Sequence, residues 1–184
     1  MPQTNVPALR IRAATFADVP EIHTIYGHHV LTTLSTFEET PPDLAEMTTR
    51  FRARIDQGMP WLVAERDGRV AGYAYASYYH ARSAYRFTVE NSIYIRQGCH
   101  RQGIGRRLLT DLIAACTALG FRQMVAVIGD SANHPSIGLH SDLGFRSAGL
   151  MESVGFKFGR WVDVVILQRS LGEGASTLPE DKPG

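Results

Sequence analysis

The sequence predicts a single α/β domain, a class that some schemes term α+β, and three observations support this prediction. The chain has 184 residues, a length that suits one domain. Stretches with strand periodicity and helix periodicity follow one another along it. The first half contains an antiparallel hairpin signal, whereas the second half contains a strand–helix–strand unit of the kind that joins parallel strands. We therefore expect a mixed, mostly antiparallel central sheet, with elements in the order β-α-α-β-β-β-α-β-α-β.

The chain begins with an alternating strand over residues 9–12, followed by two helices. Thr15 or Asp18 is suited to cap the first helix, which carries its apolar side chains on one face. Residues 28–35 either continue this helix or form a second piece. A pair of prolines then precedes the second helix, over residues 44–57, which a glycine ends.

An Asp-Gly turn in the middle of the chain marks a β-hairpin. The turn lies between two strand-like stretches, residues 61–65 and 70–78, and this combination is a strong hairpin signal. Residues 88–95 are rich in β-branched side chains and are predicted to form the next strand.

The second half begins with the longest predicted helix, residues 103–119, whose apolar side chains form one stripe. The short apolar run over residues 124–128 fits a covered strand of the parallel type. A helix over residues 136–143 and a last strand over residues 161–168 complete the predicted elements.

Composition sets the limits of the domain and excludes several classes of function. Residues 172–184 have little apolar content and are expected to form a flexible tail, so the predicted domain spans residues 8–171. The 19 Lys and Arg residues balance 18 Asp and Glu residues, which gives no basis for charge-driven binding to nucleic acid or an anionic membrane. No apolar run approaches the ~20 residues that span a bilayer, and the first residues lack a secretory pattern. We therefore expect a cytoplasmic protein. Cys99 and Cys116 belong to no cluster with zinc-ligand spacing, so no metal site is expected.

A glycine-rich loop before the longest helix is the sharpest chemical motif in the sequence. It reads Arg101-Gln102-Gly103-Ile104-Gly105-Arg106. Glycines let a backbone approach a ligand closely, and the first turn of a helix offers unpaired N–H groups with a positive dipole end. Phosphate groups bind well there, and arginines add charged hydrogen bonds. The loop lacks the endings of a nucleotide P-loop and of a dinucleotide fingerprint, and by itself it fits an ordinary turn equally well.

In context, residues 100–105 resemble the pyrophosphate loop of the GNAT superfamily of N-acetyltransferases, Gln/Arg-x-x-Gly-x-Gly/Ala after the fourth strand. His100 departs from the first position of that pattern. The resemblance narrows to the phosphinothricin and methionine sulfoximine N-acetyltransferase family, because residues 155–163 read Gly-x-Lys-x-Gly-x-Trp-x-Asp. Further matching segments follow in order along nearly the whole domain, at residues 25–27, 36–38, 72–75, 84–90, 92–95, 139–140 and 143–145.

This resemblance implies a GNAT acyltransferase fold in which a splayed pair of strands holds acetyl-CoA. It implies transfer of the acetyl group to the α-amine of small amino-acid analogues, such as phosphinothricin and L-methionine sulfoximine. The route would be direct attack of the amine within a ternary complex, without an acyl-enzyme. Members of the family commonly form homodimers, so a homodimer is expected.

The resemblance also suggests two catalytic residues. Glu90 matches the family's catalytic glutamate and would remove a proton from the amine, which is mostly protonated at neutral pH. The commoner fate of a strand glutamate is solvation or a salt bridge. His140 belongs to a Leu-His pair typical of the family. It would either protonate the departing thiolate or organise the site through hydrogen bonds, and a structural role is equally open.

Binding residues are carried over in the same way. The backbone of Ile93, Tyr94 and Ile95 would pair with the pantetheine arm of the cofactor, whose pyrophosphate would bind the glycine-rich loop. Asn133 and Ser136 would lie near the pantetheine. On the substrate side the resemblance points to Arg82, Tyr85 and Phe37, with Arg82 as the cation for a carboxylate or phosphinate.

Two other functions remain open from the sequence. One is an acetyltransferase that acts on protein N-termini, polyamines or an antibiotic. The other is a regulatory domain that binds acyl-CoA without turnover, although the presence of both Glu90 and His140 argues against it. Small changes in pocket-lining loops alter side-chain fit by ~1–3 kcal/mol, which is enough to exchange one preferred amine for another.

Overall fold

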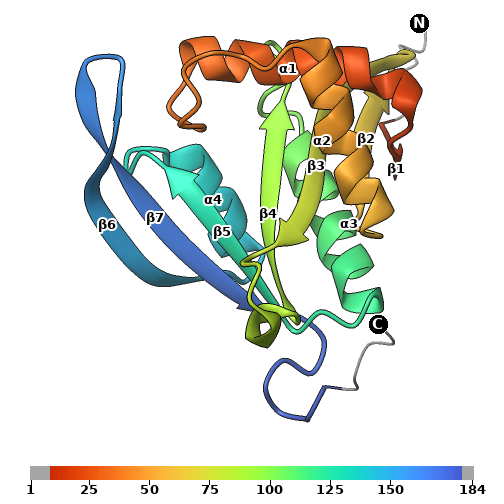
Figure 1. Ribbon diagram of the computed structural model, residues 1–184, viewed down its shortest axis with the longest axis vertical. Coiled ribbons are helices and arrows are strands. Elements are labelled where there is room, and N and C mark those ends of the chain that lie inside the picture. The colour runs from red at the N-terminus through yellow and green to blue at the C-terminus, as the bar shows by residue number, and fades with distance from the viewer. Residues whose placement is uncertain (1–8, 180–184) are drawn as a thin grey trace, which may run out of the picture.

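A seven-stranded sheet forms the centre of the computed structural model, which describes residues 9–179 (Figure 1). Its strand order is β1-β2-β3-β4-β5-β7-β6. β4 and β5 pair in parallel, and all other neighbouring strands are antiparallel. The strands are β1 Arg10–Ala13, β2 Trp61–Arg66, β3 Arg69–Tyr78, β4 Thr88–Ile95, β5 Gln123–Gly129, β6 Arg146–Lys157 and β7 Arg160–Ser170.

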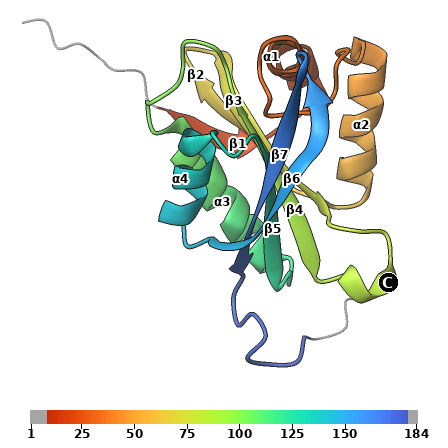
Figure 2. The same ribbon diagram turned by 90° about the vertical axis from the view of Figure 1, so that its left-hand side faces the viewer.

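Four α-helices cover the two faces of this sheet (Figure 2). Two lie on one face, α1 Val19–Thr32 and α2 Leu44–Asp56, and two on the other, α3 Ile104–Ala118 and α4 His134–Asp142. Short 3₁₀ turns occur at Phe16–Asp18 and Ser83–Tyr85. The predicted mixed, mostly antiparallel sheet is therefore confirmed, and so is the parallel strand–helix–strand unit.

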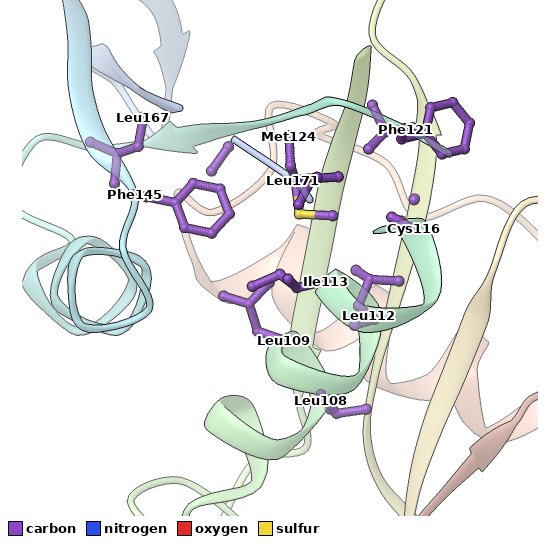
Figure 3. Close-up of a cluster of buried hydrophobic side chains, with 14 of the residues drawn as sticks. Leu108, Leu109, Leu112, Ile113, Cys116, Phe121, Met124, Phe145, Leu167 and Leu171 are labelled. Atoms are coloured by element: carbon purple, nitrogen blue, oxygen red, sulfur yellow. The ribbon is translucent and has the colours of Figure 1, made fainter. Parts of the chain in front are cut away.

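The two helical layers have separate cores. The apolar stripe of α3 packs against β2, β3 and β4, and it shares one core with residues of β5 and β7, where Leu109, Met124 and Leu167 are each at most 3% exposed (Figure 3). On the other face, side chains of α1 and α2 pack around an aromatic group that includes Trp61 and Tyr73. Truncating a buried leucine to alanine in such a core costs about 2–5 kcal/mol, so these layers hold the sheet rigidly.

One strand was not predicted. Residues 146–157 form β6, so two strands follow α4 where the sequence indicated one. β6 is an edge strand whose side chains are mostly exposed, and its register with β7 shifts at Ser147/Gly149 and again at Met151/Gly155. These irregularities break the alternation of apolar and polar residues on which a strand prediction depends. The open question about residues 28–35 is also answered, because α1 continues to Thr32 and ends there.

The region after β7 returns towards the sheet. Leu171 is 1% exposed, and the guanidinium of Arg122 donates to the hydroxyl of Thr177 at 3.0 Å and to the carbonyl of Leu178 at 3.3 Å. Residue 8 and residues 180–184, which bound the predicted domain and tail, lie outside the described residues. Within residues 9–179, none of the helices is both long and apolar enough to cross a membrane.

Candidate active site

β4 and β5 run side by side only in their first halves and then separate (Figure 1). Their pairing ends at Asn91 and Ala126, whereas β4 continues to Ile95 and β5 to Gly129. We call the point of separation the fork. A cavity of about 60 Å³ lies there. Backbone groups at the fork are without a strand partner, and buried N–H and C=O groups require one, so the fork is suited to a ligand that carries amides.

Hydrogen bonds in β4 identify the groups that face the fork. The N–H of Arg96 donates to a carbonyl of β3 at 3.0 Å, and this direction alternates along a strand. The backbone groups of Tyr94 are therefore turned to β3, where it pairs with Tyr73. Those of Ile93 and Ile95 are turned to the fork. The strand's alternation therefore supports Ile93 and Ile95 as main-chain partners of a pantetheine arm, whereas Tyr94 lines the fork cavity and turns its backbone to β3.

A larger cavity of about 670 Å³ adjoins the fork. It is bordered by the end of α1, the separated ends of β4 and β5, the first turn of α4 and the tip of the β6–β7 hairpin. Four of its lining residues, Ile93, Ile95, Asn133 and Ser136, are among those predicted to bind the cofactor. This cavity is large enough for an extended ligand that enters the fork at one end.

The glycine-rich loop leads into α3 next to this cavity. Gly103 is the N-cap of α3 and has a φ of +74°, a left-handed conformation that favours glycine. Gly105 lets α3 approach α4, since a Cβ there would lie 3.1 Å from the side chain of Leu139. The first turn of α3 contains no acidic residue. Its unpaired N–H groups are therefore suited to bind an anion.

Not every side chain of the loop is available to a ligand. Arg106 forms an ion pair with Asp142 of α4 at 2.6 Å, and the amide of Gln102 accepts a hydrogen bond from Arg66. The side chain of Ile104 is 1% exposed. For these three residues the predicted role in cofactor binding therefore rests on their backbone N–H groups, whereas Arg101 keeps an exposed side chain.

Glu90 occupies the last paired stretch of β4, next to the fork. Its side chain points to the face covered by α1 and α2, as those of Ser92 and Tyr94 do. Its carboxylate forms no hydrogen bond or ion pair within residues 9–179, and it is only partly exposed, so it is neither salt-bridged nor fully solvated. Burial raises the pKa of the Glu90 carboxyl. A carboxylate with a raised pKa is a stronger base, as proton removal from an amine requires.

His140 lies on the opposite face of the sheet and lines the fork cavity. It is 2% exposed, and both ring nitrogens have partners. Nδ1 lies 2.8 Å from the carbonyl of Ser136, and Nε2 lies 3.0 Å from Oδ1 of Asn91. Burial lowers the pKa of the imidazole, while the hydrogen bond with Ser136 opposes this effect. Of the two roles open from the sequence, this geometry favours organisation of the site.

Comparison with known proteins assigns the family. Residues 11–166 match the model described as an acetyltransferase (GNAT) domain. The chain belongs to the GNAT acetyltransferases. It is 53% identical to a phosphinothricin N-acetyltransferase of Alcaligenes faecalis over 173 residues, 94% of this chain and 88% of the relative. An L-methionine sulfoximine/L-methionine sulfone acetyltransferase of Pseudomonas paraeruginosa is 44% identical over 162 residues, 88% of this chain and 94% of the relative.

A solved structure agrees with this assignment and with the GNAT fold that the sequence predicted. The phosphinothricin acetyltransferase of Sinorhizobium meliloti, in complex with AcCoA, superposes with a TM-score of 0.91 at 49% identity. The alignment covers 94% of each chain. The recognition of the family from its loop and its Gly-x-Lys-x-Gly-x-Trp-x-Asp segment is thereby confirmed.

The predicted substrate residues of this GNAT chain do not come together. Arg82 caps the 3₁₀ turn Ser83–Tyr85, and both Arg82 and Tyr85 lie outside the two cavities at the fork. Tyr85 is 38% exposed and contacts the ring of His80. Phe37 is placed differently. Its ring packs against Gly129 at the end of β5 and Gly155 in β6, which brings the loop between α1 and α2 close to the fork, although Phe37 lines neither cavity there.

Asn133, predicted to lie near the pantetheine, also caps α4, because its Oδ1 accepts a hydrogen bond from the backbone N–H of Ser136 at 3.3 Å. Both residues line the fork cavity and the larger cavity. Asn133 is therefore also a structural residue, and its replacement would change the start of the helix that carries His140.

Two residues that sequence reasoning missed hold this GNAT site in shape. Lys157 is 1% exposed, and its ammonium donates to the carbonyl of Thr36 at 2.8 Å, which ties β6 to the loop that carries Phe37. Nε2 of His29 donates to the carbonyl of Ile95 at 2.9 Å, at the end of β4. Lys157 lies within the segment that identified the family, so its signal was present. No sequence signal indicated the role of His29, because its partner, Ile95, is distant in the sequence.

A third cavity, of about 530 Å³, lies between α2 and the sheet. Tyr75, which pairs with Ser92 in the neighbouring strand, forms part of its wall together with Trp61 and Tyr26. Because Tyr75 and Glu90 lie on the same face of the sheet, this cavity provides space on the side of Glu90.

Proposed function

We propose that this protein transfers the acetyl group of acetyl-CoA to the α-amine of small amino-acid analogues, with phosphinothricin and L-methionine sulfoximine as substrates. The observation that carries the proposal is a half-buried glutamate, Glu90, that has no hydrogen-bond or ion-pair partner within the described residues 9–179. It lies next to a fork whose neighbouring cavity accommodates an extended cofactor. The names of the relatives at 53% and 44% identity support the choice of amine.

The donor side of the reaction depends on the backbone. Acetyl-CoA supplies an activated thioester, and its amide-containing arm fits the unpaired groups of Ile93 and Ile95. His29 donates a hydrogen bond to the carbonyl of Ile95, so the backbone N–H of Ile95 is the group left for the ligand. The pyrophosphate fits the first turn of α3, where Gly103 and Gly105 let the backbone approach it.

Glu90 acts as the base, directly or through one water molecule. The α-amine of a free amino acid is mostly protonated at neutral pH, and the protonated amine cannot attack. Because burial raises the pKa of Glu90, the carboxylate accepts the proton more readily than an exposed glutamate would. Within a ternary complex of enzyme, acetyl-CoA and acceptor, the free amine then attacks the thioester carbonyl directly. The new C–N bond forms as the C–S bond breaks, and coenzyme A leaves as a thiolate that takes up a proton, with no covalent intermediate on the protein.

The acceptor lies on the α1–α2 face in this proposal. Phe37 forms one wall of its site, and Lys157 fixes the loop that carries Phe37. Arg82 and Tyr85 remain the proposed partners of the substrate carboxylate, from a segment that follows β3 directly.

We also propose that the protein is a cytoplasmic homodimer and that the partner covers the β6–β7 hairpin. The hairpin exposes Leu150, Val154, Phe156, Phe158 and Trp161, which are between 51% and 66% exposed. Large apolar side chains grouped on an edge strand are typical of an interface. Sedimentation of the wild type should show a dimer, and Trp161→Ser should shift it towards the monomer.

The test is release of free thiol from acetyl-CoA with four acceptors: phosphinothricin, methionine sulfoximine, spermidine and a peptide that begins with Ser-Ala. We expect turnover with the first two, and a fall of ~10² or more for Glu90→Gln. Glu173→Gln, the same change at an exposed position after β7, is the matched control. Turnover with the peptide or spermidine alone would reject the proposed substrates. Binding of coenzyme A without turnover would favour a regulatory domain.

A further inference from the structure

Asn91 bridges three elements at the fork, and the proposed reaction assigns it no role. It is 5% exposed, in the last pair that β4 forms with β5. Its Nδ2 donates to the carbonyl of Val125 in β5 at 3.1 Å. Its Oδ1 lies 3.0 Å from Nε2 of His140 in α4.

The orientation of this amide follows from its partners. The carbonyl of Val125 has no hydrogen to donate, so the group that faces it must be the NH₂ of Asn91. The oxygen of Asn91 then faces Nε2 of His140. The other ring nitrogen, Nδ1, faces the carbonyl of Ser136 at 2.8 Å, which is also an acceptor. Both ring nitrogens of His140 therefore meet acceptors.

A neutral imidazole has one N–H and satisfies only one of these acceptors, whereas an imidazolium satisfies both. Burial works in the opposite direction and lowers the pKa of His140. The groups that face the ring are Asn91 from β4, Ser136 from its own helix and the ring of Phe145, whose centroid is 5.0 Å away. No charged side chain within residues 9–179 contributes to this pKa. Asn91 is thus the one partner whose side chain is able to reorient.

We infer that Asn91 is a positioning residue that couples the protonation of His140 to the fork between β4 and β5. When Nε2 carries a proton, it donates to Oδ1 of Asn91, and Nδ2 holds the carbonyl of Val125. When the ring becomes neutral by loss of the proton on Nε2, the remaining hydrogen stays on Nδ1 and is donated to the carbonyl of Ser136, so the contact between Nε2 and Oδ1 has no hydrogen. Rotation of the amide then lets Nδ2 donate to Nε2 and removes the donor from Val125.

The consequence for function rests on the proposed acetyl-CoA site. The cavity at the fork is lined by both Asn91 and His140, so a ligand seated there contacts the coupled pair. By linkage, a ligand that prefers one arrangement of the amide must change the proton affinity of His140, and the proton must change the affinity for the ligand by the same factor.

The primary test is ¹⁵N NMR of the histidine rings during a pH titration of the full chain. We expect Asn91→Leu, which removes the acceptor, to lower the pKa of His140 by at least about one unit. Asn91→Asp, which places a carboxylate there, should raise it. Opposite shifts from two substitutions at one position do not arise from general loosening of the fold, and Asn91→Asp alone suffices if the leucine variant does not fold. Thr117→Val, which removes the hydrogen bond from the Thr117 hydroxyl to the carbonyl of Ile113 in α3, is the control and should leave the pKa of His140 unchanged.

The second arm measures the affinity for coenzyme A by calorimetry across the same pH range. A plot of the logarithm of the dissociation constant against pH should change slope at the pKa of His140. In each Asn91 variant this inflection should move to the new pKa of His140. The inference is overturned if both variants leave the pKa within 0.3 unit of wild type, or if the inflection stays in place. Absence of turnover would reject the proposed function and leave the NMR result intact.

Discussion

Gly155→Ala tests whether Phe37 is held in position by contact with a glycine. A Cβ at residue 155 would lie 2.3 Å from Cε2 of the Phe37 ring and 2.6 Å from Cζ. The ring must retreat by about 1 Å before this contact becomes an ordinary one. Residue 155 does not have a positive φ, so alanine adds no backbone strain there. The effect is therefore confined to the contact between residue 155 and the ring of Phe37, which is the proposed wall of the acceptor site.

The magnitude follows from this overlap. Overpacking of a well-filled site costs about 1–3 kcal/mol, and Phe37 is 41% exposed, so part of the strain is relieved towards solvent. We expect kcat/KM for phosphinothricin to fall about tenfold, which corresponds to about 1.4 kcal/mol, with an unchanged KM for acetyl-CoA. Gly149→Ala is the matched control, because a Cβ at that position in β6 meets nothing within 4 Å.

A double-mutant cycle completes this experiment. Phe37→Leu shortens the side chain, so the combination with Gly155→Ala should recover part of the loss and give a coupling energy of about 0.5–3 kcal/mol. Additive losses would show that the two residues do not act through one contact. An unchanged kcat/KM for phosphinothricin in Gly155→Ala would refute the assignment of Phe37 to the acceptor wall.

Three further predictions concern the glycine-rich loop, the hydrogen bond of Lys157 and the proposed base. Gly103→Ala places a Cβ at a φ of +74°, so we expect the free energy of unfolding, measured in urea, to fall by about 1–2 kcal/mol. The KM for acetyl-CoA should rise, and an unaltered KM would contradict the role of the loop in binding the cofactor. Lys157→Met removes the hydrogen bond to Thr36 and should lower the free energy of unfolding by about 1.5–3 kcal/mol, measured by denaturation. Equal stability would contradict the role of Lys157 in tying β6 to the loop that carries Phe37. Glu90→Gln should raise the melting temperature. Because the folded pKa of Glu90 is raised, the wild type loses stability as pH rises through it, so the gain should be larger at pH 7 than at pH 4.

The sequence predicted elements where one periodicity holds over a whole stretch. β4 begins and ends at its predicted residues, Thr88 and Ile95, and the apolar stripe of α3 is the core in Figure 3. β6 escaped prediction because its register shifts twice and its side chains are mostly exposed. An edge strand with bulges has no hydrophobic pattern for the sequence to reveal.

The site was predicted as a set of positions, while the contacts between them required the structure. Gln102 and Arg66 are 36 residues apart, and His140 and Asn91 are 49 apart, so no local pattern pairs them. The family motif indicated Glu90, but it did not show that the carboxylate has no salt-bridge partner in the part of the chain that the structure describes. The motif also did not show that the backbone of Tyr94 faces β3, whereas the backbones of Ile93 and Ile95 face the fork.

Identification of the product tests the central claim most directly. The wild type is incubated with acetyl-CoA and phosphinothricin, and the product is analysed by mass spectrometry and NMR. We predict a product with one acetyl group on the α-amine. Glu90→Gln should form this product more slowly than the wild type by a factor of ~10² or more, and its affinity for coenzyme A should be unchanged. An unmodified amine after long incubation, with coenzyme A bound to the wild type, would contradict the assignment of this protein as an acetyltransferase of phosphinothricin.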